Sequence, residues 1–294
     1  MLAAIPFPDI SPEIFTITLF SMSFALRWYA MGYIVGILIG WWIAVQASKR
    51  LSLWRDDTPP LSRDQIEDLL TWVIIGVIAG GRFGYVLFYG QGQFNEDPLQ
   101  IFRVWDGGMS FHGGFIGVCL AVVTCARRYG AALGDVANLL ALTATPAILL
   151  VRIANFINAE LWGRPTDVPW GVIFPGAAAQ DCAGVAVGLC ARHPSQLYEA
   201  LTEGLILGAI ILFLAFKRGW LKRKWSLVAV FLIGYGLARF AIEFVRQPDL
   251  QFTSPDNPIG WAYHFGTWGL TQGQALSIPM ILGGVVVIFL TRRT

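Results

Sequence analysis

Seven long apolar stretches constrain what this chain can fold into. Each approaches the roughly 20 residues with which a helix crosses the hydrocarbon core of a bilayer. Of the 294 residues, 55% are apolar and only 14% are charged, which is too apolar for an ordinary soluble domain. The sequence therefore predicts an all-α polytopic membrane protein with seven transmembrane helices, folded as a single transmembrane domain over residues 1–294. The expected spans lie at about residues 17–47, 69–89, 109–126, 133–157, 197–216, 225–245 and 275–291.

The basic residues predict the orientation of these spans. They gather in alternate loops, at 49–63, 127–128, 217–224 and 292–293, and short cytoplasmic loops collect Lys and Arg. We therefore expect the N-terminus outside and the C-terminus in the cytoplasm. The net charge of +2 follows from this topology and gives no reason to expect a nucleic-acid partner.

Two longer segments, 158–195 and 246–273, both fall on the predicted outer side. In the first, the mixture of Gly, Pro and Trp from Trp170 to Gly176 predicts a small irregular or strand-containing extracytoplasmic cap, inserted at 158–195. Cys182 and Cys190 share this cap, and the sequence leaves both a disulfide and two free thiols open. The cysteines show no metal-ligand spacing, and the sequence gives no sign of a metal or organic cofactor.

Arginines within the apolar stretches are the strongest functional signal. An ionisable side chain in a span costs about 2.5–3.5 kcal/mol on insertion scales and marks a candidate functional site. Arg82, Arg152 and Arg239 lie in or at the edge of spans, with few compensating acids, chiefly Glu243 and Glu203. An excess of guanidinium groups calls for an anion, and the planar fork of Arg suits phosphate, which a bilayer offers in its phospholipid head groups.

Helical spacing places these polar residues on common faces. Arg152 and Asn155 are three residues apart, while Arg239, Glu243 and Arg246 are separated by four and three, so each set can share one side of a helix and converge on one cavity. The alternative is an internal Arg–Glu network, such as Glu243 with Arg239, which could coexist with ligand binding.

Other polar residues leave alternatives open. His112, the only histidine in a predicted span, is either a satisfied structural residue or a general base. Tyr29 is either an interfacial aromatic or a hydroxyl that faces the cavity. The segment 193–199 is typical of the start of the fifth span, which favours helix capping there. A transporter would use similar buried charges, but the internal repeat expected of one is not found.

Five ordered motifs, covering almost the whole chain, resemble the bacterial phosphatidylglycerol:prolipoprotein diacylglyceryl transferases. The stretch from Arg152 to Gly163 is similar to the family's signature Gly-Arg-x-Gly/Ala-Asn-Phe-x-Asn-x-Glu-x-x-Gly, with Val151 where glycine is usual. The five motifs run from Gly80 to Tyr89, from Trp105 to Gly114, from Arg152 to Arg164, from His193 to Glu199 and from Arg239 to Asp249.

The resemblance implies transfer of the diacylglyceryl group of phosphatidylglycerol to the lipobox cysteine thiol of a prolipoprotein signal peptide, forming a thioether and releasing glycerol 1-phosphate. It implies a bacterial cytoplasmic (inner) membrane enzyme with its active site toward the extracytoplasmic side. Carried over from the family, Arg152 and Arg239 bind phosphate and act in catalysis, and His112 is the expected base. Tyr29 joins the catalytic residues. The remaining residues expected to bind or support phosphatidylglycerol are Asn155, Glu160, Gly163, Glu243 and Arg246.

Overall fold

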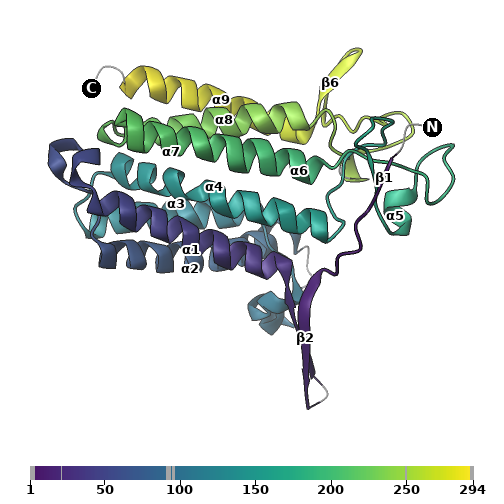
Figure 1. The fold of residues 1–294 in the computed structure, drawn as a ribbon, viewed down its shortest axis with the longest axis horizontal. Coiled ribbons are helices and arrows are strands. Elements are labelled where there is room, and N and C mark those ends of the chain that lie inside the picture. The colour runs from purple at the N-terminus through teal and green to yellow at the C-terminus, as the bar shows by residue number, and fades with distance from the viewer. Residues whose placement is uncertain (1–3, 21, 91–93, 95–96, 249, 292–294) are drawn as a thin grey trace. The chain divides into compact units, whose positions relative to one another are not determined.

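The structure is a computed structural model that describes residues 4–20, 22–90, 94, 97–248 and 250–291, and it is mostly helical (Figure 1). Five of its described helices are long and apolar enough to cross a membrane: α1 (Trp28–Lys49), α2 (Arg63–Tyr89), α4 (Leu133–Ile157), the continuous helix Ser195–Arg218 and α9 (Gln272–Thr291). Two shorter apolar helices, α3 (Phe111–Arg128) and α8 (Ser226–Ile242), fall in the remaining predicted spans. A polytopic membrane fold is therefore supported, while the number of spans and their orientation stay predictions.

Parts of these expectations fall on residues that lie outside the described residues, namely 1–3, 21 in the first predicted span, 249 and 292–294. They include the extreme N-terminus, Asp249 of the fifth motif and the basic pair Arg292 and Arg293.

The helix Ser195–Arg218 has three parts. It begins as α6 (Ser195–Glu199), widens into the π-helical segment η5 (Ala200–Ile206) and continues as α7 (Leu207–Arg218). Elsewhere, short 3-10 turns lie in the connections, at Leu51–Leu53, Arg55–Asp57, Pro98–Phe102, Val104–Asp106, Trp220–Lys222 and Leu250–Phe252.

The chain divides into two compact units. Unit 1 comprises Met1–Gly40, Ala141–Arg218 and Ser226–Thr294, and unit 2 comprises Trp41–Leu140 and Gly219–Trp225. In unit 2, Ser62 caps α2 by accepting a hydrogen bond from the Gln65 backbone at 3.4 Å, and the Gln65 side chain accepts one from Ser62 N. Helices α2 and α3 then pack through glycines: a Cβ at Gly84 would lie 2.8 Å from the Cα of Gly113. Small residues thus permit close helix approach.

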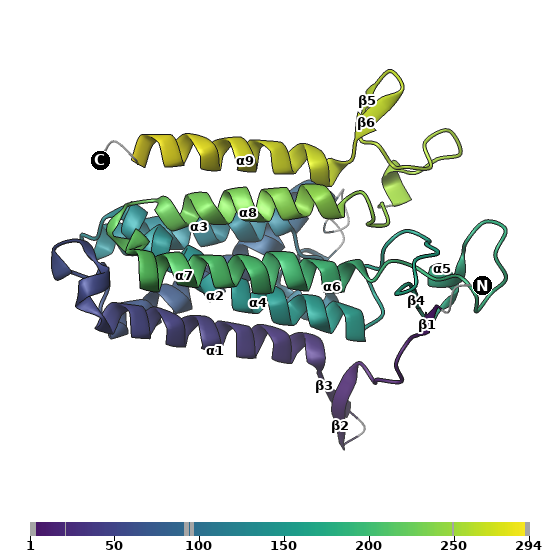
Figure 2. The ribbon, with the colours of Figure 1, turned by 45° about the horizontal axis from the view of Figure 1, so that its top comes forward.

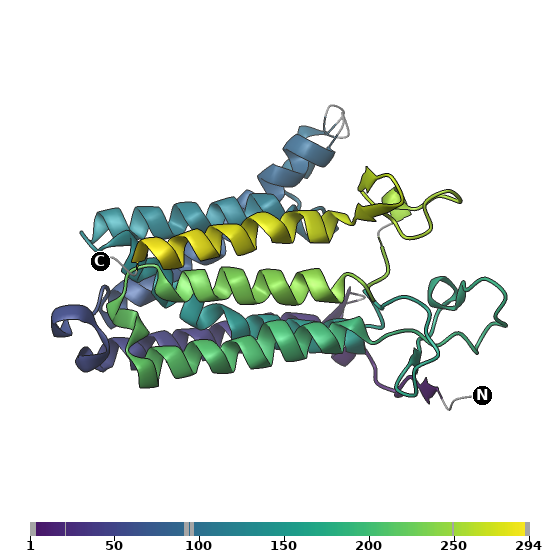
Figure 3. The same cartoon turned by 90° about the horizontal axis from the view of Figure 1, so that it is seen from above.

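Unit 1 packs its helices in the same way. In Figures 1, 2 and 3, α8 and α9 lie side by side along their length. A Cβ at Gly204 of η5 would lie 2.6 Å from the Cα of Leu149, so this glycine lets η5 approach α4 closely. Glu203 directly precedes Gly204, and Arg152 lies three residues after Leu149. The same close approach therefore brings the Glu203 carboxylate beside the Arg152 guanidinium.

Three two-stranded sheets accompany the described helices. Strand β1 (Ile5–Pro6) pairs in parallel with β4 (Val172–Ile173), β2 (Glu13–Leu19) pairs antiparallel with β3 (Met22–Arg27), and β5 (Tyr263–Phe265) pairs antiparallel with β6 (Trp268–Leu270). Figure 2 shows the β5–β6 hairpin at the N-terminal end of α9. The described fold is therefore mostly helical, as predicted, with short strands beside the helices, and β4 belongs to the segment for which a strand-containing cap is predicted.

The β2–β3 hairpin also corrects the first predicted span. Residues 17–27 were assigned to a helix that began at 17, but α1 starts at Trp28. Polar side chains alternate along this segment, with Thr16 and Thr18 in β2, and an alternation of period two favours a strand over a helix. Glu13 and Arg27 close the open end of the hairpin with an ion pair of 3.5 Å.

The segment 158–195 contains the strand that its composition predicts, β4, followed by α5 (Ala177–Gln180). A small apolar cluster forms its centre, where Val172, Phe174 and Ala179 are buried against Phe7 and Trp162, among others. Of the two alternatives for the cysteines in this segment, the structure has the disulfide: Cys182 and Cys190 are bonded, with their Cα atoms 6.2 Å apart.

Candidate functional site

Two of the predicted arginines meet on one carboxylate. Arg152 from α4 places Nη1 3.2 Å from Oε2 of Glu199, and Arg239 from α8 places Nη1 2.8 Å from Oε1 of the same residue. Glu199 is fully buried at the end of α6. Two helices that are distant in sequence therefore bring their guanidinium groups to a shared counter-ion, which fixes where both charges lie.

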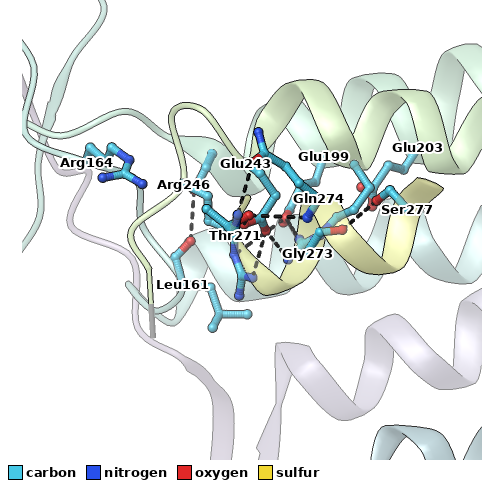
Figure 4. A network of polar contacts seen from close by, with 12 residues as sticks. Leu161, Arg164, Glu199, Glu203, Glu243, Arg246, Thr271, Gly273, Gln274 and Ser277 are labelled. Atoms are coloured by element: carbon cyan, nitrogen blue, oxygen red, sulfur yellow. Dashed lines mark hydrogen bonds and ion pairs between the residues drawn. The ribbon is translucent and has the colours of Figure 1, made fainter. Parts of the chain in front are cut away.

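Glu243 and Arg246 extend this cluster at the end of α8. Glu243 pairs through Oε1 with Nη2 of Arg239 and, at 3.5 Å, with Nη1 of Arg246. Its other oxygen, Oε2, accepts a hydrogen bond of 2.8 Å from the Thr271 hydroxyl. Figure 4 shows Glu199, Glu243, Arg246 and Thr271 pointing toward one another.

Thr271 is also the N-terminal cap of α9. Its hydroxyl accepts a hydrogen bond from the Gln274 backbone at 3.2 Å, and the Gln274 side chain accepts one from Thr271 N at 3.1 Å, a reciprocal capping box. The start of α9 is thereby tied to the charged cluster through Glu243. The sequence does not single out Thr271, although Thr-x-x-Gln before an apolar run is the signal that marks such a cap.

The signature segment forms a tight turn after α4. Asn155 is buried and donates a hydrogen bond of 2.8 Å to Oε1 of Glu160, and Asn158 donates a second one of 3.1 Å to the same oxygen. Ala159 and Leu161 have positive φ angles of 52° and 57°, which close the turn. The two asparagines thus hold the Glu160 carboxylate in place on the side of the turn where α4 ends.

Gly163 follows at a position where a side chain does not fit. Its N–H donates to the carbonyl of His193 at 2.8 Å, and a Cβ there would lie 2.5 Å from the carbonyl oxygen of Val245. Gly163 also forms a bridge with Arg246. The glycine therefore permits the signature segment to lie directly against the chain that carries Arg246.

Arg192 is a buried cation that the sequence does not single out. Its guanidinium donates to the carbonyls of Ala179, Asp181 and Gly163 and to Oε1 of Gln247, and it stacks on the Trp162 ring at 4.2 Å. Such contacts tie the cap to the segments on either side of Gly163 and Arg246. Next to it, burial lowers the pKa of His193, whose Nδ1 lies 3.2 Å from the Tyr198 hydroxyl.

The expected excess of positive charge is wrong for this cluster. Arg152, Arg239 and Arg246 face three buried carboxylates, those of Glu199, Glu203 and Glu243; Glu203 lies 3.7 Å from Nη2 of Arg152. For the segment 193–199 the sequence favours helix capping, whereas its last residue, Glu199, pairs with two arginines. The internal Arg–Glu network, the alternative left open by the sequence, is therefore present.

Arg82 departs from that expectation in another way. In unit 2 its guanidinium donates to the backbone carbonyls of Gln100, Ile101, Gly107 and Gly108, and the residue is 7% exposed. Backbone dipoles therefore take the place of the anion that the sequence suggested for this residue.

The remaining predicted residues lie at two places. In unit 1, Tyr29 stands in the first turn of α1, with its hydroxyl 3.3 Å from that of Tyr33. In unit 2, His112 is exposed in the first turn of α3, after Ser110, which caps that helix. The approach of His112 to the arginines, like the catalytic roles of all these residues, stays a prediction.

Comparison with known proteins gives one family. A family model described as prolipoprotein diacylglyceryl transferase matches residues 17–290. A protein of Roseobacter denitrificans named phosphatidylglycerol–prolipoprotein diacylglyceryl transferase is 58% identical over 293 residues, covering 100% of this chain and 99% of the relative. Proteins with the same name from Ruegeria pomeroyi and Caulobacter vibrioides are 56% and 44% identical, covering 99% and 95% of this chain and 99% and 92% of the relatives.

The match includes all of the polar residues described above and leaves few residues at either end uncovered. The resemblance seen in the five sequence motifs is therefore confirmed at the level of the family and of the kind of enzyme. The chain belongs to the prolipoprotein diacylglyceryl transferase family and is a transferase of this kind.

Proposed function

We propose that the chain transfers the diacylglyceryl group of phosphatidylglycerol to the thiol of the lipobox cysteine in prolipoprotein signal peptides. The observation that carries this proposal is the cluster of Arg152, Arg239 and Arg246, which α4 and α8 bring together in unit 1. Three guanidinium groups at one place provide the forked donors that a phosphodiester needs. The relatives' names add the substrates, a phosphatidylglycerol and a prolipoprotein.

The reaction makes one bond and breaks one. The thiolate sulfur attacks the carbon of the diacylglyceryl group that is bonded to the phosphate oxygen. A carbon–sulfur bond forms there, and the carbon–oxygen bond breaks with its electron pair leaving on glycerol 1-phosphate. The proton of the thiol ends on a base or on the released phosphate. Because the leaving group gains negative charge, cations held in place around it lower the barrier.

Different residues bind the phosphate, position the arginines and take the proton of the thiol. Arg152 and Arg239 bind the phosphate and stabilise the charge that develops on it, and Arg246 adds a third cation at the same place. Glu243 pairs with both Arg239 and Arg246 and so holds them in position. Asn155, Glu160 and Gly163 shape the turn beside α4, and the Tyr29 hydroxyl contributes a polar group there. His112 acts as the base toward the thiol, whose ordinary pKa of about 8.5 leaves it mostly protonated at neutral pH.

The proposal includes a place in the membrane. Seven spans with the N-terminus outside and the C-terminus in the cytoplasm put the charged cluster and the segment 158–195 on the outer side of the bacterial cytoplasmic membrane. Phosphatidylglycerol reaches the cluster from the bilayer, and the signal peptide of the prolipoprotein reaches it from the same side. The outward loops carry few basic residues, as this orientation requires.

Removal of either central arginine tests the proposal. We expect Arg152→Ala and Arg239→Ala to abolish transfer in an assay with labelled phosphatidylglycerol and a lipobox peptide, because the phosphate loses a charged ligand. The product is identified by mass spectrometry as the thioether peptide. Arg63→Ala is the matched control, since Arg63 is an exposed arginine at the start of α2 that pairs with Glu67 at 3.0 Å and lies over the Trp41 ring, away from the charged cluster in sequence.

The same assay separates a transferase from a transporter. Lipid translocation in vesicles without any thioether product would favour the transporter that the sequence left open. Full transfer activity in either alanine variant, with correct membrane insertion, would contradict the phosphate-binding role.

His112→Gln tests the base separately, since recovery of its rate at alkaline pH, where the thiol ionises unaided, would support that role.

A further inference from the structure

Glu203 differs from the other two acids of the charged cluster. It is fully buried in the π-helical segment η5, and neither of its carboxylate oxygens accepts a hydrogen bond from any residue that the structure describes. Its nearest cation is Nη2 of Arg152 at 3.7 Å. By contrast, Glu199 accepts a hydrogen bond of 2.8 Å from Arg239, and Glu243 accepts one of 2.8 Å from Thr271. Glu203 is therefore the least stabilised carboxylate of the three.

Local structure keeps Glu203 in this position. A π-helical turn inside a helix is uncommon and is found often at functional sites, because it displaces side chains from the ordinary helical register. Gly204 packs η5 closely against α4 at Leu149, which keeps the backbone that carries Glu203 next to the helix that carries Arg152. A buried carboxylate without hydrogen bonds is costly to keep ionised, and such groups tend to become neutral instead.

The charges around Glu203 come from three directions. In α7, the next ionisable side chain after Glu203 is Lys217, and α9 has none between Gln272 and Leu290. The ionisable groups that face Glu203 are Arg152 on α4, Glu199 on α6, Tyr235 and Arg239 on α8, and Arg246 beyond the end of α8.

The positive and negative charges of this cluster are equal in number without a ligand and unequal when an anionic ligand binds. Arg152, Arg239 and Arg246 carry three positive charges, and the three glutamates carry three negative ones. A phosphodiester that binds to the arginines adds a fourth negative charge to a buried cluster and also draws Arg152 away from Glu203. The free energy needed to keep a carboxylate ionised beside this extra charge is therefore greatest for Glu203, which accepts no hydrogen bond from the described residues.

We infer that Glu203 takes up a proton when the anionic head group of phosphatidylglycerol binds to Arg152 and Arg239. The inference rests on the proposed function, because it takes the arginine cluster as the phosphate site. Protonation restores the charge balance, and it leaves Arg152 free to direct its donors to the phosphate. Glu203 is a positioning residue in this scheme, since it acts on the lipid through Arg152.

Binding without reaction measures this coupling. The probe is a short-chain, water-soluble phosphatidylglycerol, added to the full chain in nanodiscs of zwitterionic lipid with no prolipoprotein present, so that no thiol substrate ionises. Isothermal titration calorimetry in buffers of different ionisation enthalpy counts the protons taken up. The wild type is expected to bind close to one proton per lipid and to gain affinity as the pH falls, by up to about tenfold per pH unit.

Two isosteric variants make the result specific. Glu203→Gln is expected to bind the lipid at least as tightly as the wild type at alkaline pH, with no proton uptake at Glu203 and a flat pH dependence. Glu67→Gln makes the same chemical change at an exposed carboxylate of α2 and should keep the wild-type proton uptake. The difference between wild type and Glu203→Gln also removes any contribution from His112 and His193, which both retain.

Each outcome decides a separate point. Binding without proton uptake in the wild type, or equal uptake in Glu203→Gln, overturns the role of Glu203 and leaves the phosphate site standing. No binding of phosphatidylglycerol at all overturns the inference together with the phosphate site. If Glu203→Gln does not fold, infrared spectroscopy of the wild type decides, because the carbonyl band of a protonated carboxylic acid must appear when lipid is added and its absence contradicts the inference.

Discussion

At the scale of single residues, Glu199 joins the charged cluster, because this fully buried carboxylate pairs with both Arg152 and Arg239. Arg152, Arg239 and Glu243 are predictable because charges in apolar stretches are costly, and Arg246 because it lies one helical turn after Glu243. The structure brings all four together. The sequence does not predict Glu199 as a charge partner, because this residue lies near a proline at the start of a helix, where capping is an ordinary explanation. Only the three-dimensional arrangement shows that α4 and α8 both direct an arginine to it.

Glu199 should therefore be a main source of stability in the cluster. Glu199→Gln leaves Arg152 and Arg239 buried without their shared counter-ion, and removal of one partner from a buried ion pair costs about 3–5 kcal/mol. We expect a clear fall in the thermal unfolding temperature in detergent, together with loss of transfer activity. Glu67→Gln, at a surface pair, should unfold like the wild type, since exposed pairs contribute about 0–1 kcal/mol. Equal unfolding temperatures for the two variants would refute this view of Glu199.

At the scale of elements, the helices followed from the sequence and the hairpins did not. Apolar runs of sufficient length predicted α1, α2, α4 and α9, because length and hydropathy are local properties. The strands β2 and β3 overlap the first predicted span, because their apolar content masks the alternation of polar residues along them. The close packing of α1 on α4 was also beyond sequence reasoning, because a glycine pattern does not name its partner helix.

Gly36 gives a test of that packing. A Cβ at this position of α1 would lie 2.9 Å from the Cβ of Ala147 on α4, so Gly36→Ala forces the two helices apart. We expect a loss of about 1–3 kcal/mol in stability, as for other overpacked sites, and a fall in activity because α4 carries Arg152. Gly283→Ala on α9 is the control, since nothing lies within 4 Å of a Cβ there. A wild-type unfolding curve for Gly36→Ala would show that the close contact does not matter.

At the scale of the whole molecule, composition determined the class of protein and the charge pattern determined its expected orientation. Neither property says how the chain divides, whereas the structure has two compact units with the charged cluster in unit 1 and His112 in unit 2. The proposed function assigns roles to groups in both units, with the arginines directed to the phosphate and His112 to the thiol. The sequence motifs could suggest this partnership only through the family, because residues so far apart in the chain share no local pattern.

The orientation predicts which thiols can be reached from outside. In a variant that lacks Cys119 and Cys125, intact spheroplasts should resist a membrane-impermeant maleimide until a reductant is added, and should then label at Cys182 and Cys190. The reason is that the two cysteines are bonded and lie in the segment 158–195, on the predicted outer side. Labelling only after the membrane is opened would contradict the predicted orientation. Labelling before reduction would show that the disulfide is not formed.

The most direct test of the central claim is a structure of the full chain bound to phosphatidylglycerol. The phosphate should lie within hydrogen-bonding distance of the guanidinium groups of both Arg152 and Arg239, with Arg152 moved away from Glu203. A head group bound elsewhere, with the contacts of both arginines to Glu199 unchanged at 3.2 and 2.8 Å, would contradict the account.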